Sequence, residues 1–131
     1  MVLEVARRLA ALRHGGWQPS RTLMFAFWDA EEYGLLGSTE FAEDRARELQ
    51  DRAVVYINSD MYTPGRLVAG GVPSLRDFIV ELGRDIPSAA LTPAPGEREP
   101  ELSALGSGAD FVAFQDYLGV PTLALEFLFE G

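Results

Sequence analysis

The stretch "RTLMFAFWDAEEYGLLGS", residues 21–38, joins a strongly apolar run to a cluster of acidic residues. Residues 21–28 form a continuous apolar run rather than an alternation, which predicts a β-strand buried on both faces. Three carboxylates follow at Asp29, Glu31 and Glu32. Like charges at the end of a buried element repel one another and are costly to desolvate. We therefore expect these carboxylates to have a function that compensates for their repulsion and desolvation.

The rest of the chain alternates predicted helices with predicted strands. Apolar residues at helical spacing predict helices at 2–13, 38–52, 74–83 and 108–119. Apolar runs predict strands at 53–60 and 122–129 and a short strand at 67–69, and a Pro- and Glu-rich stretch predicts a surface loop at 87–101. We expect Gly15-Gly16 to end the first helix and Ser38 to cap the second. The alternation predicts an α/β fold, a three-layer αβα sandwich with a mainly parallel, mixed sheet and helices on both faces.

Composition narrows the class of protein. The chain has 131 residues, which suits one domain over residues 1–131, and its formal net charge is −9. This charge makes nucleic acid and anionic membranes poor partners, because both reward clustered Lys and Arg. The absence of cysteine excludes disulfides and thiolate metal ligands. We find no signal peptide pattern and no transmembrane segment, and these observations leave the compartment open.

Two predicted strands end in carboxylates. Asp29, Glu31 and Glu32 follow the first strand, and Asp60 ends the second. Ligands of open α/β sheets bind beyond the carboxyl ends of the strands, where a divalent cation would offset the repulsion. A carboxylate beside a metal-bound water can act as a general base. Alternatively, the first cluster is only the acidic first turn of a helix, and Asp60 is only a turn residue.

Three segments carry a family resemblance. They read "FAFWDAEEYGLLGSTEFAE" at 25–43, "VVYINSDMY" at 54–62 and "LGSGADFVAFQDYLGVP" at 105–121. Together they resemble the catalytic domain of the co-catalytic zinc peptidases that include glutamate carboxypeptidase II (prostate-specific membrane antigen) and bacterial zinc aminopeptidases. The resemblance covers residues 2–129, and its first motif is highly specific. It implies a zinc-exopeptidase-like fold, incomplete in this chain.

The resemblance also implies roles for individual residues. Glu31 matches the general base that activates a zinc-bound water, Glu32 matches a ligand of one zinc ion, and Asp60 matches a ligand of the other. Ser107 and Gly108 lie on a segment that borders the substrate cleft in the family. The implied activity is that of a metallo-exopeptidase, an amino- or carboxypeptidase acting on peptide substrates.

Other parts of the family site have no counterpart here. The family also uses imidazole ligands and a bridging Asp, which lie outside the matched segments. The single histidine, His14, matches no ligand and is explained by a favourable position at a helix C-terminus. Trp28 and Asp29 match the signature without a ligand role, so we expect them to pack and support the site. The chain is therefore expected to be a central fragment of a catalytic domain, with weak zinc binding and no activity on its own.

The sequence is also compatible with other classes of protein. The chain could be a non-catalytic binding or dimerisation module, as in the transferrin-receptor-like branch of the family, or a flavodoxin-like domain with acidic strand ends. Retention of all three of Glu31, Glu32 and Asp60 favours the peptidase. Substrate specificity stays open, because Ala109 stands where glutamate-preferring members have Asn. An incomplete sheet leaves open edges, so we also expect self-association or a homodimer.

Overall fold

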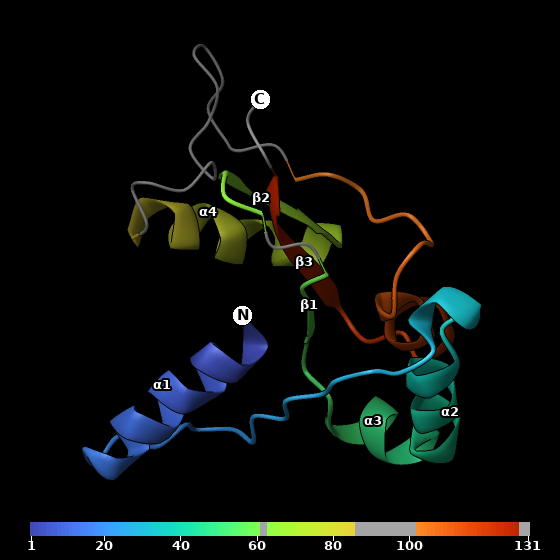
Figure 1. Cartoon of the computed structure of the whole chain (residues 1–131), viewed down its shortest axis with the longest axis horizontal. Coiled ribbons are helices and arrows are strands. Elements are labelled where there is room, and N and C mark those ends of the chain that lie inside the picture. The colour runs from blue at the N-terminus through green and yellow to red at the C-terminus, as the bar shows by residue number, and fades with distance from the viewer. Residues whose placement is uncertain (61–62, 86–101, 129–131) are drawn as a thin grey trace.

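The computed structural model describes residues 1–60, 63–85 and 102–128 (Figure 1). Its helical elements are α1 (Val2–His14), η1 (Glu31–Tyr33), α2 (Leu36–Asp44), α3 (Ala46–Arg52), η2 (Pro73–Leu75), α4 (Arg76–Asp85) and η3 (Ala113–Tyr117). Its strands are β1 (Tyr56–Asn58), β2 (Arg66–Gly71) and β3 (Thr122–Leu128). The chain thus has an incomplete α/β fold, as the sequence predicts.

The strands form one small mixed sheet in the order β1-β3-β2. β1 pairs with β3 in parallel, with Tyr56 opposite Thr122. β2 pairs with β3 antiparallel, with Gly71 opposite Leu123. The sheet is mixed, as predicted, although its antiparallel pairing extends over six residue pairs and its parallel pairing over three. The strand predicted at 67–69 is the longer β2.

Two hydrophobic clusters cover opposite faces of this sheet. Side chains alternate along a strand, so Tyr56 and Thr122 face one way and Leu123 faces the other. The Tyr56 face packs against α2 and η3, and the buried members of that cluster are Ala42, Ala113, Phe114, Leu118 and Val120. The Leu123 face packs against α4, and its buried members are Ala69, Ile79 and Leu123. Helices therefore lie on both faces, with η3 beside α2 in Figure 1.

The predicted helices are present with shifted boundaries. α1 and α4 confirm the first and third, and Gly16 leaves α1 with a φ of +98°, a value that suits glycine. The helix predicted at 38–52 begins earlier and is divided at Arg45 into α2 and α3. Ser38 is not its cap, because Ser38 lies inside α2 and its hydroxyl donates to the carbonyl of Leu35.

The helix predicted at 108–119 begins later than expected. Two α-helical residues, 111–112, lead into η3, which is a π-helix over Ala113–Tyr117. π-helical turns are rare and are often found near functional sites. The wide turn places Ala113 and Phe114 in the core together.

The strand predicted at 21–28 is the main error. This segment is extended, but it forms no ladder with any described strand, and Leu23, Met24, Phe25 and Phe27 are exposed. The apolar pattern of residues 21–28 shows that both faces of the segment could be buried. Burial also requires a neighbouring strand and a covering helix, which the pattern does not predict. The loop predicted at 87–101 lies outside the described residues. Within the described part of the chain, no helix combines the length and apolar character needed to cross a membrane.

Candidate active site

The acidic motif folds into a tight turn between the extended segment and α2. Glu31 and Glu32 lie in η1, which is flanked by Ala30 and Leu35, both left-handed with φ values of 52° and 59°. The amide of Leu35 donates to the carbonyl of Glu31 at 2.8 Å, and the amide of Tyr33 donates to Ala30. Left-handed backbone at residues other than glycine costs free energy and tends to occur at functional sites. The strain therefore makes this turn a candidate site independently of its charges.

Gly37 allows the turn to close. Its amide donates to the carbonyl of Asp29 at 3.2 Å. A Cβ atom at position 37 would lie 2.5 Å from Oδ1 of Asp29 and 2.8 Å from its carbonyl oxygen. No side chain fits at such distances without displacement of the backbone. The last glycine of "GLLG" is thus required by the close approach of α2 to Asp29.

Trp28 anchors the turn to the core. Its indole Nε1 donates a hydrogen bond to the hydroxyl of Tyr56 at 3.0 Å. Its ring lies 5.1 Å from that of Phe41 and 5.7 Å from that of Phe114. The predicted packing role of Trp28 is confirmed. The contact ties the residue before the acidic turn to β1, the strand that ends near Asp60.

Carboxylates from separate elements converge on Glu31. The pKa of Glu31 is raised, first by desolvation on burial and then by the charges of Glu32, Asp110 and Asp60. Burial also raises the pKa of Tyr56 to about 12, with smaller contributions from Asp110 and Asp60, while the Trp28 hydrogen bond opposes the rise. Charges just after β1 and at the start of the 110–118 segment therefore act on the carboxylate of the turn and on Tyr56.

The other predicted site residues, Asp60, Ser107 and Gly108, are exposed. Asp60 is exposed and lines an open pocket of about 270 Å³ with Ser59, Phe27 and the first residues of α1. Ser107 and Gly108 are exposed in a bend just before Asp110. In the chain they lie three and two residues before Asp110, whose charge acts on Glu31.

The described residues do not complete a metal site. Among them, no group of three His, Cys, Asp or Glu side chains is placed to hold a metal ion. His14 ends α1, whereas Leu3 near its start lines the Asp60 pocket. At ~1.5 Å rise per residue, His14 lies about 17 Å farther along the helix axis than Leu3. His14 therefore does not line the Asp60 pocket.

Two buried polar residues near the site were not assigned from the sequence. Asp110 and Asn58 are both buried. Both residues lie within motifs that the sequence analysis singled out: Asp110 ends the "GSGAD" segment, and Asn58 lies two residues before Asp60 in "YINSD". Only the packing of η3 on β1 shows that both are enclosed.

Carboxylates gathered beyond the carboxyl end of a parallel strand place the chain among α/β proteins with a strand-end site. The family described as Peptidase family M28 matches residues 1–130, and the chain belongs to this family.

Curated relatives agree with this family. The chain is 34% identical to mouse "Aminopeptidase NAALADL1", over 99% of this chain and 20% of the mouse protein. It is 35% identical to "Probable glutamate carboxypeptidase LAMP1" of Arabidopsis thaliana, over 97% of this chain and 20% of that protein. It is 33% identical to "Glutamate carboxypeptidase 2 homolog" of Caenorhabditis briggsae, over 94% of this chain and 18% of that protein. The chain thus spans about a fifth of these relatives, 20%, 20% and 18% of their lengths.

Proposed function

We propose that this chain carries the carboxylate part of a metallo-exopeptidase active site. Glu31 is the general base, and Glu32 and Asp60 are ligands of the metal ions. The proposal rests on the charges of Glu32, Asp60 and Asp110, which lie in three separate segments of a family M28 chain and all raise the pKa of Glu31. A base with a raised pKa is better matched to accepting a proton near neutral pH.

Zinc is the metal that the family resemblance implies. Two carboxylates do not fit a complete zinc site, because zinc sites in proteins rely on imidazole or thiolate ligands as well. We therefore propose that the chain by itself binds zinc weakly and does not turn over peptides. His14 is the single histidine of the sequence, so further imidazole ligands would have to come from outside these 131 residues.

Peptides are the proposed substrates, with Ser107 and Gly108 at the edge of the cleft. Relatives are named as an aminopeptidase and as glutamate carboxypeptidases, so both kinds of exopeptidase remain possible. Ala109, next to Gly108, offers no polar group to an acidic substrate side chain. A preference for glutamate is therefore not part of the proposal.

Metal content and hydrolysis test this proposal together. The chain, dialysed against zinc, is expected to retain less than stoichiometric metal and to leave simple aminoacyl and γ-glutamyl substrates intact. Weak zinc binding, followed by titration, should fall further in Glu32→Gln and Asp60→Asn but not in the exposed control Glu43→Gln. Tight stoichiometric zinc with turnover would show that the site is complete. Zinc binding unaffected by Glu32→Gln and Asp60→Asn would show that the ligands are wrongly assigned.

Self-association is a second proposal, and it is favoured by the exposed apolar segment 21–28. Its side chains Leu23, Phe25 and Phe27 are exposed, and open backbone edges invite pairing with another chain. Light scattering across a concentration series is expected to show a mass above that of one chain. A constant monomer mass at high concentration would contradict it.

A further inference from the structure

Two buried polar groups near the site lack a partner among the described residues. They are Oδ1 of Asp110 and Nδ2 of Asn58, on residues that are 6% and 3% exposed. A buried polar atom without a hydrogen bond costs roughly 1–3 kcal/mol, so such atoms are rarely left unsatisfied in pairs. One of these atoms is an acceptor and the other is a donor, so a single water molecule that accepts from Nδ2 of Asn58 and donates to Oδ1 of Asp110 would satisfy both.

The packing of β1 places Asn58 toward the start of the 110–118 segment. Tyr56 and Asn58 lie on the same face of β1, because side chains alternate along a strand. The ring of Tyr56 stacks on that of Phe114 at 4.2 Å and 11°. Asp110 precedes Phe114 by about one helical turn. Asn58 therefore faces the turn that holds Asp110.

The direction of the segment agrees with this placement. From Asp110 the chain runs through η3 to Pro121, whose carbonyl accepts a hydrogen bond from the amide of Tyr56, at the first residue of β1. The end of the segment thus lies at the start of β1, and its beginning lies toward the carboxyl end. The charge of Asp110 also raises the pKa of Tyr56, which fits a position close to β1.

We propose that one water molecule bridges the side-chain amide of Asn58 and the carboxylate of Asp110, and that this bond positions Ser107 and Gly108 over the carboxyl end of β1. Asn58 and Asp110 are then positioning residues. The bond itself does not depend on peptidase activity, whereas its value for substrate binding rests on the proposed function. The tests below use neither metal nor substrate, so they can fail or succeed separately from that function.

A double-mutant cycle on the folding equilibrium tests the bond. Asn58→Leu and Asp110→Leu are each expected to lower the folding constant roughly 5- to 150-fold, because each leaves one buried group without a partner. The double variant should lose little more than either single variant, because both polar groups are gone. Independent, additive losses would overturn the proposal.

Gln115 provides the matched control, because its Oε1 is the other buried side-chain atom without a partner in the described part of the chain. Gln115→Leu combined with Asn58→Leu is expected to give additive losses. Strong coupling in this second cycle would assign the Asn58 partner to Gln115 and overturn the proposal. If a leucine variant does not fold, Asp110→Asn and the exchanged pair Asn58→Asp with Asp110→Asn replace it. The exchanged pair should fold more stably than Asp110→Asn alone, and equal or lower stability would overturn the proposal.

Proton–nitrogen correlation spectra test the positioning role. The backbone signals of Ser107 and Gly108 are expected to move in Asp110→Asn and to return toward their original positions in the exchanged pair. Ile79→Val, which loosens the core on the opposite face of the sheet, should leave them in place. Unmoved signals in Asp110→Asn would overturn the positioning role, as would the same movement in Ile79→Val.

Discussion

Phe27 and Trp28 are neighbours in the sequence, yet they belong to two different regions of the molecule. Phe27 is 63% exposed at the end of the extended segment. Trp28 packs against the buried ring of Phe114 and hydrogen-bonds to Tyr56. The two side chains are similarly apolar, so hydrophobicity does not separate them. What separates them is whether another element brings a complementary surface to that position.

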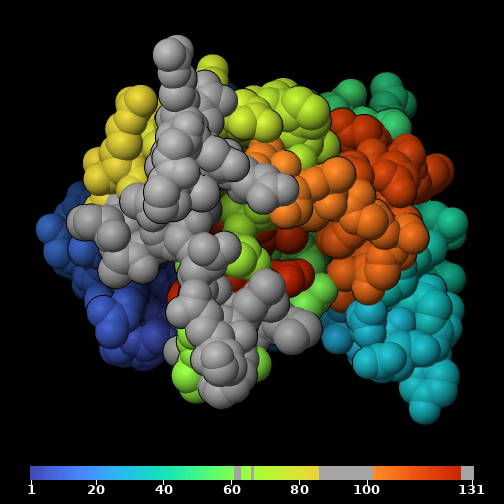
Figure 2. Space-filling view, turned by 90° about the horizontal axis from the view of Figure 1, so that it is seen from above, coloured from blue at the N-terminus to red at the C-terminus, as the bar shows by residue number. Residues whose placement is uncertain are grey.

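The same contrast holds for the backbone. The turn after Trp28 is closed by several main-chain hydrogen bonds, whereas residues 19–27 make none with the described part of the chain. Figure 2 shows α1, which begins the open region, and α2, which follows the turn, on opposite sides of the molecule. The acidic turn is thus held by main-chain hydrogen bonds beside α2, whereas Asp60 lines a pocket with Phe27 and the start of α1.

The largest expected difference between the two regions comes from truncating one ring in each. Phe114→Ala should lower the free energy of unfolding by about 3–5 kcal/mol, because it leaves a cavity in the buried cluster. Phe27→Ala should change it by no more than about 0.5 kcal/mol. Urea unfolding of both variants measures the contrast. A similar loss in both would show that Phe27 is buried in solution, for instance by a second copy of the chain.

The close approach of α2 to the turn predicts the next effect. Gly37→Ala should cost about 1–3 kcal/mol of stability, because its Cβ would overlap Asp29. Gly106→Ala is the matched control, since a Cβ there meets nothing within 4 Å. Thermal or urea unfolding compares the two. Equal stability of Gly37→Ala and Gly106→Ala would show that the turn is not closed in this way.

The raised pKa of Glu31 predicts a pH dependence of stability. The folded chain holds this proton to a higher pH than the unfolded chain, in which the pKa is near 4.5. The ionised carboxylate therefore destabilises the fold above its folded pKa, and the cost disappears as the pH falls toward 4.5. Glu31→Gln should be more stable than the natural chain at neutral pH, with the difference vanishing in acid.

The control for that experiment is Glu43→Gln, which removes one negative charge from an exposed position in α2. Unfolding free energies measured from pH 4 to 8 would compare the three chains. If Glu31→Gln has the same unfolding free energy as the natural chain at every pH, the pKa of Glu31 is not raised by folding. The same conclusion follows if Glu43→Gln changes the pH dependence as much as Glu31→Gln does.

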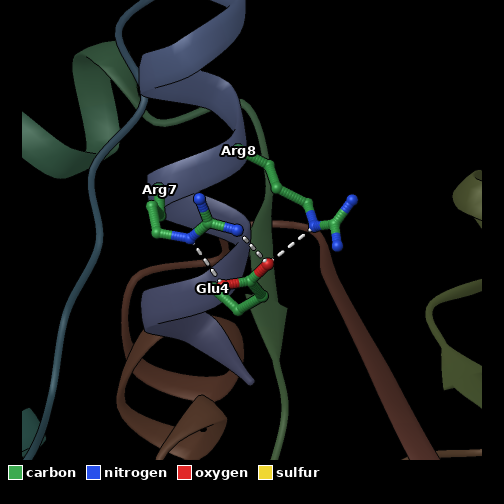
Figure 3. Close-up of polar contacts among 3 residues, drawn as sticks. All are labelled: Glu4, Arg7 and Arg8. Atoms are coloured by element: carbon green, nitrogen blue, oxygen red, sulfur yellow. Dashed lines mark hydrogen bonds and ion pairs between the residues drawn. The ribbon is translucent and has the colours of Figure 1, made fainter.

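The smallest effect is expected in α1, which has no fully buried residue. Glu4 accepts hydrogen bonds from Arg7 at 2.8 and 2.7 Å and from Arg8 at 2.8 Å (Figure 3). These exposed pairs are screened by salt and contribute little. Glu4→Gln should lower the helix content measured by circular dichroism slightly at low salt and not at high salt. A loss that persists at high salt would show that Glu4 does more than pair with these arginines.

Much of the fold could be predicted because local patterns suffice for helices. The apolar spacing in α1 and α4, and the glycines after α1, act within a few residues. The mixed sheet was also predictable in kind. The left-handed residues Ala30 and Leu35 were not, because they are imposed by the closure of the turn and not by the propensities of alanine and leucine.

Some features of the candidate site could likewise be predicted from the sequence, and others could not. The motif around Glu31 and the strand-end Asp60 could be recognised in the sequence, and the assignment of their roles remains a prediction. The buried state of Asn58 and Asp110 could not be seen, because Asn and Asp are ordinarily exposed or found in turns. Their enclosure follows from the stacking of Tyr56 on Phe114, a contact between residues far apart in the chain.

The sequence by itself determined the family, the α/β character and the acidic turn, since these depend on residue types and their local spacing. The tertiary structure decided which apolar residues are buried and which carboxylates meet. It partly buried Trp28 and left Phe27 exposed, and it let the charges of Asp110 and Asp60 act on Glu31. The physical reason is that burial and charge repulsion act between surfaces. They are settled only when elements distant in the chain come into contact.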